Sequence, residues 1–218
     1  MESEEYHLAE LSVAADGTDS RRIMPPILDS YSRILDVGCG AGQTLIASNT
    51  GPGVFAAGVD VNLSALALGK KLDGRFGFVC AKGEALPFQT GSFDFVFSRV
   101  SLPYMHLNNA LSEMCRVLRV GGSLWIVLHP FSMAAGRFLE NLSQLKIKGA
   151  IYSLYVLANG LSIHSVGKQI PLRSRSGINE SFQTNRGISR ELRRAGFDNI
   201  VIERGRFFVV TASKAARR

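Results

Sequence analysis

The sequence has few of the residues that cross-link a chain or anchor it in a membrane. Its three cysteines, Cys39, Cys80 and Cys115, are widely spaced and form no CxxC pair, so neither a disulfide framework nor a cysteine-bound metal is expected. No apolar run approaches the ~20 residues that span a bilayer, and the acidic first residues lack the basic and then apolar pattern of a secretory signal. These absences predict a reduced, cytoplasmic protein with no membrane span and no metal site.

The length and the charge of the chain limit its organisation further. With 218 residues and 46% hydrophobic content, it can bury one substantial core but not two full-sized domains, so residues 1–218 are expected to form a single domain. Residues 1–60 hold three Arg against nine Asp and Glu, whereas residues 131–218 hold fifteen Lys and Arg against five acidic residues. The basic end suits nucleic acid, an anionic membrane or an acidic small substrate, and it equally suits a solvated basic surface.

Short apolar runs alternate with amphipathic stretches along most of the chain. This alternation is typical of βα units around a largely parallel sheet. The strands are expected near 33–38, 54–60, 76–81, 93–98 and 122–128, and the helices at about 41–49, 63–72 and 107–119.

The alternation stops between residues 131 and 183. This segment combines an apolar part at 151–158 with the basic stretch Pro171–Ser176. A regular βα connection is shorter, and long excursions from a compact domain are usually functional covers or disordered segments. We therefore expect an inserted lid over 131–183.

The chain then returns to regular elements. Ile188, Leu192 and Ala195 have helical spacing, and Gly196 is a typical helix stop. Two strands at 199–203 and 206–212 are too close for a helical crossover and predict an antiparallel hairpin. The predicted fold is thus α/β, a Rossmann-like doubly wound sheet that is mostly parallel, with an antiparallel last hairpin and an inserted lid.

A glycine turn follows the first predicted strand. Gly38, Gly40 and Gly42 stand at every second position, which lets the backbone approach a ligand closely. The dinucleotide fingerprint G-x-G-x-x-G would place the third glycine at position 43, which is Gln. Asp36, just before the turn, would repel a pyrophosphate and suits a ligand with an ammonium and a sulfonium.

A second carboxylate stands at the end of the neighbouring predicted strand. Asp60 can accept hydrogen bonds from both hydroxyls of an adenosine ribose; as the alternative, it caps the following helix. Further motifs occur in order downstream. They are Glu84-Ala85-Leu86-Pro87-Phe88, Ser92-Phe93-Asp94 and Arg116-Val117-Leu118-Arg119-Val120-Gly121-Gly122.

Together with the turn at 34–42 and with Asp60, these motifs resemble class I S-adenosylmethionine-dependent methyltransferases. The similarity covers about Arg33 to Pro130 and points to the small-molecule group that includes the ubiquinone and menaquinone methyltransferases. It implies S-adenosylmethionine as cofactor, S-adenosylhomocysteine as product, and Asp36 as the partner of the methionine amino group. The other implied contacts are Gly38, Cys39, Gly40, Ala41 and Gly42 for the methionine portion, Asp60 and Val61 for the ribose, Gly83 and Glu84 for the adenine, and Ser98, Arg99 and Val100 for the sulfonium and the substrate opening.

One position departs from the family pattern. Many relatives have an acidic or amide side chain for the adenine amino group where Lys82 stands. A lysine cannot accept that hydrogen bond, so backbone groups or Glu84 would have to serve.

Three residues are candidates for catalytic contacts with the methyl acceptor. His106 and His129 follow the fourth and fifth predicted strands, at the sheet edge where ligands of open α/β folds bind. Each is a candidate general base, with a plain loop residue as the alternative. Tyr104 is expected to line the substrate mouth or else the edge of the core. A base is optional, because alignment of an activated methyl donor already lowers the barrier.

The predicted activity is in-line transfer of a methyl group to an O, N or C nucleophile of a small molecule. The apolar and basic parts of the lid favour an anionic or amphiphilic acceptor. A nucleic-acid or protein methyltransferase is the first alternative. Nucleic acid is not expected as the substrate, because Ser98-Arg99-Val100-Ser101 differs from the Asn/Asp-Pro-Pro-Tyr motif of amino-methylating nucleic-acid enzymes, and no Pro-Cys nucleophile of the cytosine-C5 type occurs. A non-catalytic S-adenosylmethionine-binding protein is the second. The sequence predicts neither the acceptor nor the oligomeric state.

Overall fold

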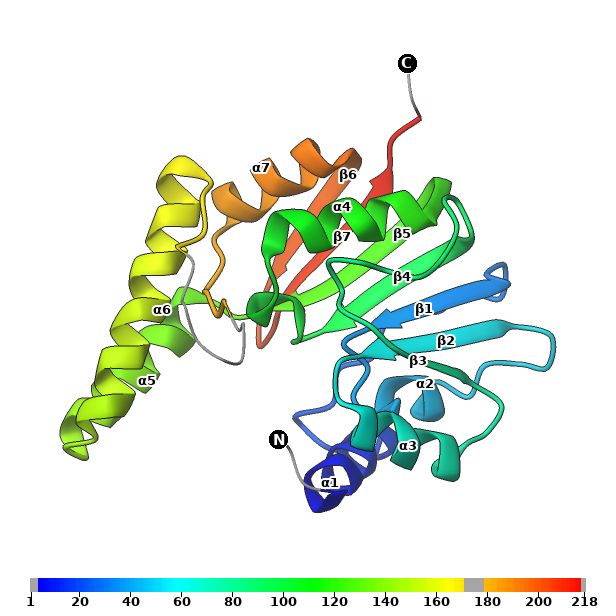
Figure 1. The fold of residues 1–218 in the computed structure, drawn as a ribbon, viewed down its shortest axis with the longest axis horizontal. Helices are drawn as coiled ribbons and strands as arrows, with labels where there is room; N and C mark the ends of the chain where they lie inside the picture. The colour runs from blue at the N-terminus through cyan, green and yellow to red at the C-terminus, as the bar shows by residue number, and fades with distance from the viewer. Residues whose placement is uncertain (1–3, 171–178, 217–218) are drawn as a thin grey trace.

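The computed structural model describes residues 4–170 and 179–216 and is organised around a seven-stranded sheet in the order β3-β2-β1-β4-β5-β7-β6 (Figure 1). β1 to β5 pair in parallel, and β7 pairs antiparallel with both β5 and β6. The predicted fold class is confirmed. The strands are β1 (Arg33–Val37), β2 (Phe55–Asp60), β3 (Gly77–Cys80), β4 (Phe93–Arg99), β5 (Leu118–Leu128), β6 (Phe197–Arg204) and β7 (Phe208–Lys214).

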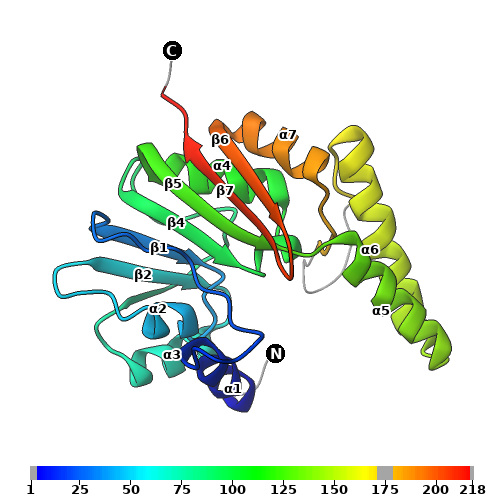
Figure 2. The same ribbon diagram turned by 180° about the vertical axis from the view of Figure 1, so that it is seen from behind.

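Helices cover both faces of the sheet. Figures 1 and 2 show α4 and α7 on one face and α1, α2 and α3 on the other. The helices are α1 (Glu4–Ala15), α2 (Gln43–Ala47), α3 (Leu63–Leu72), the 3-10 turn η1 (Leu102–Tyr104), α4 (Leu107–Val117), α5 (Phe131–Ser143), α6 (Ile147–Val166) and α7 (Asn185–Ala195).

The strands separate two apolar clusters, because successive side chains of a strand point to opposite faces. In β4, Phe95 and Phe97 join the cluster under α2, whereas Val96 joins the cluster under α4 and α7. Burial on both faces explains why the central strands are almost continuously apolar. The one buried carboxylate within β1, Asp36, is therefore out of place in a strand of this kind.

Local signals explain most element boundaries. Gly196 ends α7 with φ +100°, as its position predicted, and Thr184 caps the start of that helix by accepting from the N–H of Gly187. α2 is shorter than the predicted 41–49, because Gly42 and Asn49 have positive φ at its two ends. β5 begins at Leu118 and not near 122, directly after α4.

The segment predicted to form a lid, residues 131–183, contains a helical hairpin. α5 and α6 lie side by side and project beyond the carboxyl end of β5 (Figure 1). Phe182 fills the space beside α6, since a Cβ at Gly160 would lie 2.2 Å from its ring. The chain returns to the sheet where the N–H of Gln183 donates to the carbonyl of His129 at 2.9 Å. The basic stretch Pro171–Ser176 lies outside the described residues. Within residues 4–170 and 179–216, no helix is long and apolar enough to cross a membrane.

Candidate functional site

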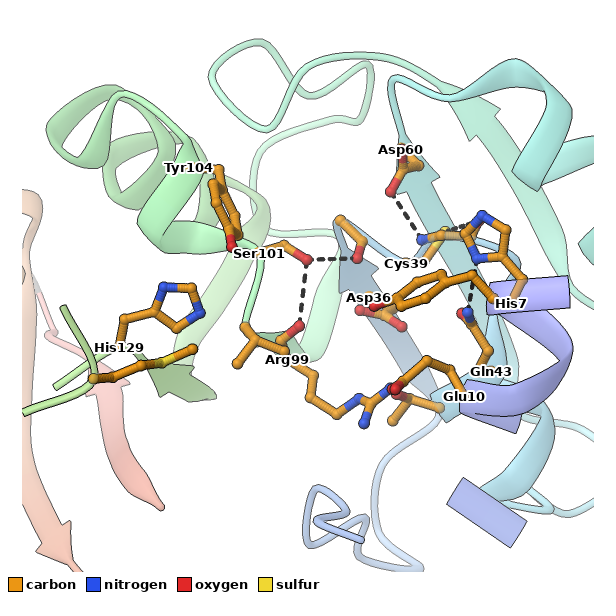
Figure 3. A pocket seen from close by; sticks show the side chains of 16 residues that line it. His7, Glu10, Asp36, Cys39, Gln43, Asp60, Arg99, Ser101, Tyr104 and His129 are labelled. Carbon is orange, nitrogen blue, oxygen red and sulfur yellow. Dashed lines mark hydrogen bonds and ion pairs between the residues drawn. The ribbon is translucent and has the colours of Figure 1, made fainter. Parts of the chain in front are cut away.

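A cavity of about 360 Å³ opens at the carboxyl ends of β1, β2, β4 and β5 (Figure 3). β1 lies between β2 and β4, so the cavity occupies the point where the strand order reverses, which is where open α/β sheets bind ligands. One end, here called the glycine end, is formed by Asp36, Gly38, Cys39, Gly40 and Asp60. The opposite part, the histidine end, is formed by Tyr104, His129 and Met133.

The glycine turn has a backbone that other residues adopt only at a cost. Gly38, Gly40 and Gly42 have φ of +78°, +55° and +73°, the left-handed region that glycine enters freely. Gly38 also has no room for a side chain: a Cβ there would lie 2.2 Å from the Cβ of Ser101. The Ser101 hydroxyl donates to the Gly38 carbonyl at 2.8 Å, so the turn is fixed from the end of β4.

Asp60 ties the glycine turn to the end of β2. Its Oδ2 accepts from the N–H of Gly40 and its Oδ1 from the N–H of Asn62, both at 2.8 Å. The side chain of Asn62 caps α3 by accepting from the N–H of Ala65. The alternative interpretation of Asp60 as the cap of this helix is therefore wrong. Each carboxylate oxygen has a second lone pair for hydroxyl donors of a ligand.

Asp36 is a buried carboxyl group at the centre of the glycine end. It is 2% exposed, and burial raises its pKa to about 8; the nearby Asp60 adds to this rise and the Arg99 guanidinium opposes it. A carboxylate withdrawn from water is stabilised by a cation brought beside it. The glycine end therefore combines a cation site at Asp36 with diol acceptors at Asp60, which fits the amino group and the ribose of S-adenosylmethionine.

The amino-terminal helix closes this part of the cavity, and the sequence reasoning had missed it. Tyr6, His7 and Glu10 of α1 line the cavity. Glu10 forms an ion pair with Arg99 at 3.0 Å, and the Nδ1 of His7 lies 2.9 Å from the Nε2 of Gln43 (Figure 3). The acidic first turn of α1 is a favourable helix start, but α1 has no apolar periodicity that would have predicted it.

The histidine end combines a buried imidazole, His129, with the exposed side chains of Tyr104 and Met133. The rings of Tyr104 and His129 meet edge to face with their centroids 5.3 Å apart. The Nδ1 of His129 lies 3.8 Å from Oε1 of Glu180. Burial lowers the pKa of His129, and the Glu180 carboxylate opposes that shift. The lowered pKa favours the neutral imidazole, the state in which it accepts a proton.

The predicted site residues divide into those that line the cavity and those that do not. Arg99 and Val100, which has φ +56°, line it along with the residues of its two ends. Ala41, Ser98 and Val61 do not line it: Ala41 and Ser98 are fully buried, whereas Val61 is 66% exposed. The structure thus brings the carboxylates, the first two turn glycines and one predicted histidine together.

The residues predicted to meet the adenine, Gly83 and Glu84, and the second candidate base, His106, do not line this cavity. Oε1 of Glu84 accepts from the N–H of His106 at 2.7 Å, and a Cβ at Gly83 would lie 2.6 Å from the sulfur of Met105. His106 lines a separate cavity of about 230 Å³ between α4, α6 and α7. His129 is thus the candidate base that shares a cavity with the glycine turn.

Comparison with known proteins agrees with this geometry. Residues 35–126 match a family model described as a methyltransferase domain. This part of the chain is therefore similar to a methyltransferase domain, as its motifs predicted.

Two curated relatives share this region. A ubiquinone/menaquinone biosynthesis C-methyltransferase UbiE from Rhizobium johnstonii is 38% identical over 106 residues, which cover 44% of this chain and 40% of the relative. The O-methyltransferase rstn1 of Aspergillus nomiae is 35% identical over 101 residues, covering 43% of this chain and 45% of the relative. The similarity thus spans less than half of either relative.

Solved structures extend the likeness over the whole fold. An S-adenosylmethionine-dependent methyltransferase from Thermotoga maritima superposes with a TM-score of 0.58 and 17% identity, over 96% of this chain and 89% of the other. At this identity the likeness shows the fold alone, so the activity has to be argued from the site.

Proposed function

We propose that this protein transfers a methyl group from S-adenosylmethionine to a small-molecule acceptor and releases S-adenosylhomocysteine. The observation that carries this proposal is the glycine end, where a buried carboxyl group at Asp36 and the Asp60 carboxylate flank a backbone turn that excludes side chains. These groups suit a ligand that combines a cation with a diol. A pyrophosphate would be repelled by the Asp60 carboxylate and would oppose ionisation of Asp36.

Each residue of the glycine end has one role in this proposal. Asp36 holds the amino group of the cofactor, Asp60 accepts hydrogen bonds from the ribose hydroxyls, and Gly38 and Gly40 let the methionine portion lie against the backbone. The cofactor, when bound, supplies an electrophilic methyl group on a sulfonium. The protein aligns the acceptor with that methyl group and excludes water from the cavity, and such alignment alone removes several kcal/mol, ~7–11 in well-oriented cases, from a barrier.

The histidine end and the lid are the proposed acceptor site. Tyr104, His129 and Met133 offer an aromatic and apolar wall. On the lid, Leu145, Ile147 and Ile151 are 86%, 72% and 65% exposed, which supports an amphiphilic acceptor whose apolar part extends along the hairpin. The relatives that methylate carbon and oxygen support the same two acceptor atoms here. A cytoplasmic location stays a prediction.

Calorimetry with S-adenosylmethionine and S-adenosylhomocysteine tests the cofactor proposal. We expect both to bind, and the Asp60→Asn variant to bind at least tenfold more weakly, since a neutral amide accepts ribose hydrogen bonds less strongly than a carboxylate. Asp198→Asn, on the exposed edge strand β6, is the matched control. If the unmodified protein shows no binding of either compound, the proposal is wrong.

Catalysis needs a separate experiment. The protein is incubated with methyl-labelled S-adenosylmethionine and a metabolite extract, and a labelled product is sought by mass spectrometry. A labelled small molecule supports the proposal and identifies the acceptor. Cofactor binding with label in nucleic acid or protein favours the first alternative, and binding without any labelled product favours a non-catalytic protein.

A further inference from the structure

Glu180 is a buried carboxylate behind the wall of the histidine end. It is 3% exposed and contacts three elements. Its Oε1 accepts from Nη1 of Arg137 on α5 at 2.8 Å, and its Oε2 accepts from the hydroxyl of Tyr152 on α6 at 2.9 Å. The same Oε1 lies 3.8 Å from Nδ1 of His129 at the end of β5. One carboxylate thus joins both lid helices to the candidate base.

Fastening the lid does not require the contact with His129. A buried carboxylate costs several kcal/mol unless hydrogen bonds and a cation compensate it, and Arg137 and Tyr152 already supply both. Burial raises the pKa of the Tyr152 phenol, so this hydroxyl stays protonated as a donor. The carboxylate nevertheless lies beside Nδ1 of His129, and a carboxylate next to one ring nitrogen is the arrangement that fixes a histidine tautomer in catalytic sites.

We propose that Glu180 is a positioning residue that acts through His129, an inference that rests on the proposed methyl transfer. The carboxylate holds a proton on Nδ1, so that Nε2 keeps its lone pair for the cavity that His129 lines. Nε2 then takes a proton from the methyl acceptor, and the electron pair of that O–H or C–H bond stays on the acceptor atom. The acceptor class is therefore a compound whose methylated atom carries a weakly acidic proton, such as a phenol or an activated carbon.

The groups around His129 give Glu180 a second effect. Burial disfavours the imidazolium, Glu180 favours it and Arg137 disfavours it; the ring of Tyr104 packs edge to face against the imidazole. When His129 gains a proton, the Glu180 carboxylate is the negative charge beside it. The separation of 3.8 Å exceeds a hydrogen bond by about 1 Å, and catalytic hydrogen bonds are commonly long in ligand-free sites and shorten in the substrate complex.

Nitrogen-15 NMR of the four histidines tests the inference without any acceptor. The signals of His129 are assigned by their loss in His129→Asn. We expect the unmodified protein to carry the proton of neutral His129 on Nδ1. In Glu180→Gln we expect a mixture of tautomers and a lower His129 pKa, because the charge that favours the imidazolium is gone. Glu203→Gln, a carboxylate exposed on β6, should change neither.

The unmodified protein alone can overturn the inference. If neutral His129 carries its proton on Nε2, Glu180 does not position the base, whether or not Glu180→Gln folds. An unchanged tautomer and pKa in a folded Glu180→Gln would also overturn it. If Glu180→Gln lowers only the thermal unfolding temperature, Glu180 stabilises the packing of the lid helices and does not act through His129.

Turnover provides the second readout, with the acceptor found by the labelling experiment. We expect Glu180→Gln to lower kcat about 100-fold, the low end of what a positioned acid or base contributes, with little change in KM, and Glu180→Asp to recover part of the loss. Calorimetric binding of S-adenosylmethionine should be unaffected. If the unmodified protein fails to bind the cofactor, the proposed function fails, whereas the tautomer result stands by itself.

Discussion

The glycine end and the histidine end of the cavity lie at one edge of the same sheet but are built in opposite ways. The glycine end is mostly backbone: three left-handed glycines follow β1, and Asp60 binds the turn through the N–H of Gly40. The histidine end is made of side chains. Tyr104, His129 and Met133 come from separate segments, and Glu180 behind them is held by Arg137 of α5 and Tyr152 of α6.

This difference separates the two tasks of the proposed enzyme. A backbone turn presents the same groups whatever the surrounding side chains are, so it suits a ligand common to many proteins. A set of side chains held by an inserted hairpin can change without disturbing the sheet, so it suits a ligand particular to one protein. Changes at the glycine end should therefore affect cofactor binding, and changes at the histidine end should affect acceptor turnover.

The largest effect is expected from Gly38→Ala. The left-handed backbone costs an alanine roughly 1–2 kcal/mol, and its Cβ would lie 2.2 Å from that of Ser101. We expect S-adenosylmethionine to bind about 100-fold or more weakly by calorimetry. Gly205→Ala, at a glycine with nothing within 4 Å of its added Cβ, should bind normally. Near-normal affinity in folded Gly38→Ala would show that the turn does not hold the cofactor.

The next effect is a dependence of cofactor affinity on pH through Asp36. Its pKa is about 8 in the ligand-free fold, and the ammonium of the cofactor favours the carboxylate. Binding therefore releases a proton, and affinity should rise by up to about tenfold per pH unit below that value. Calorimetry in buffers of different ionisation enthalpy measures the released proton. Asp36→Asn should remove the dependence; a flat profile in the unmodified protein would contradict the prediction.

The same group has the opposite effect on the stability of the ligand-free protein. Since the folded pKa of about 8 lies above the ordinary 3.8, the protonated form contributes stability below about pH 4, and this contribution is lost as pH rises through 8. The thermal unfolding temperature of the ligand-free protein should fall over this pH range. A saturating concentration of S-adenosylmethionine should reduce the fall, because its ammonium favours the Asp36 carboxylate.

A smaller effect is expected from Arg99, which makes the Asp36 carboxylate less unfavourable. In Arg99→Met we expect the pKa of Asp36 to rise and the affinity for S-adenosylmethionine at pH 7 to fall several-fold, up to about tenfold for each unit of added shift. Arg75→Met, which breaks a surface ion pair with Asp73, is the control for loss of an arginine. An affinity profile that does not move to higher pH would exclude this role of Arg99.

The same contrast explains how much of the structure the sequence predicted. The glycine turn, the strand ends at Asp36 and Asp60 and the helix stop at Gly196 depend on neighbouring residues, and these local signals predicted the fold and the glycine end. α1 escaped prediction because it has no apolar stripe; its Glu10 reaches Arg99 only in the folded chain.

At the histidine end, one histidine was predicted and its surroundings were not. His129 was a candidate because it follows a strand, a local signal, and the same signal gave His106, which faces another cavity. Glu180 had no signal, because it reaches His129 only after two lid helices have folded between them. Long-range packing decides which of the two histidines shares a cavity with the glycine turn.

The smallest effect is expected from Tyr152→Phe, which changes a contact between α6 and Glu180 and leaves the glycine end untouched. The change removes one hydroxyl that donates to Glu180 at 2.9 Å, and such a hydrogen bond contributes about 1 kcal/mol to stability. Tyr155→Phe, on the same helix, loses a hydroxyl that donates to the carbonyl of Ile170 at 2.9 Å and serves as the control.

Both variants should unfold at slightly lower temperatures. Only Tyr152→Phe should lower acceptor turnover, by a few-fold, since Arg137 still holds the carboxylate. Cofactor affinity should stay unchanged in both, and a weaker affinity in Tyr152→Phe would show that the two ends of the cavity are coupled.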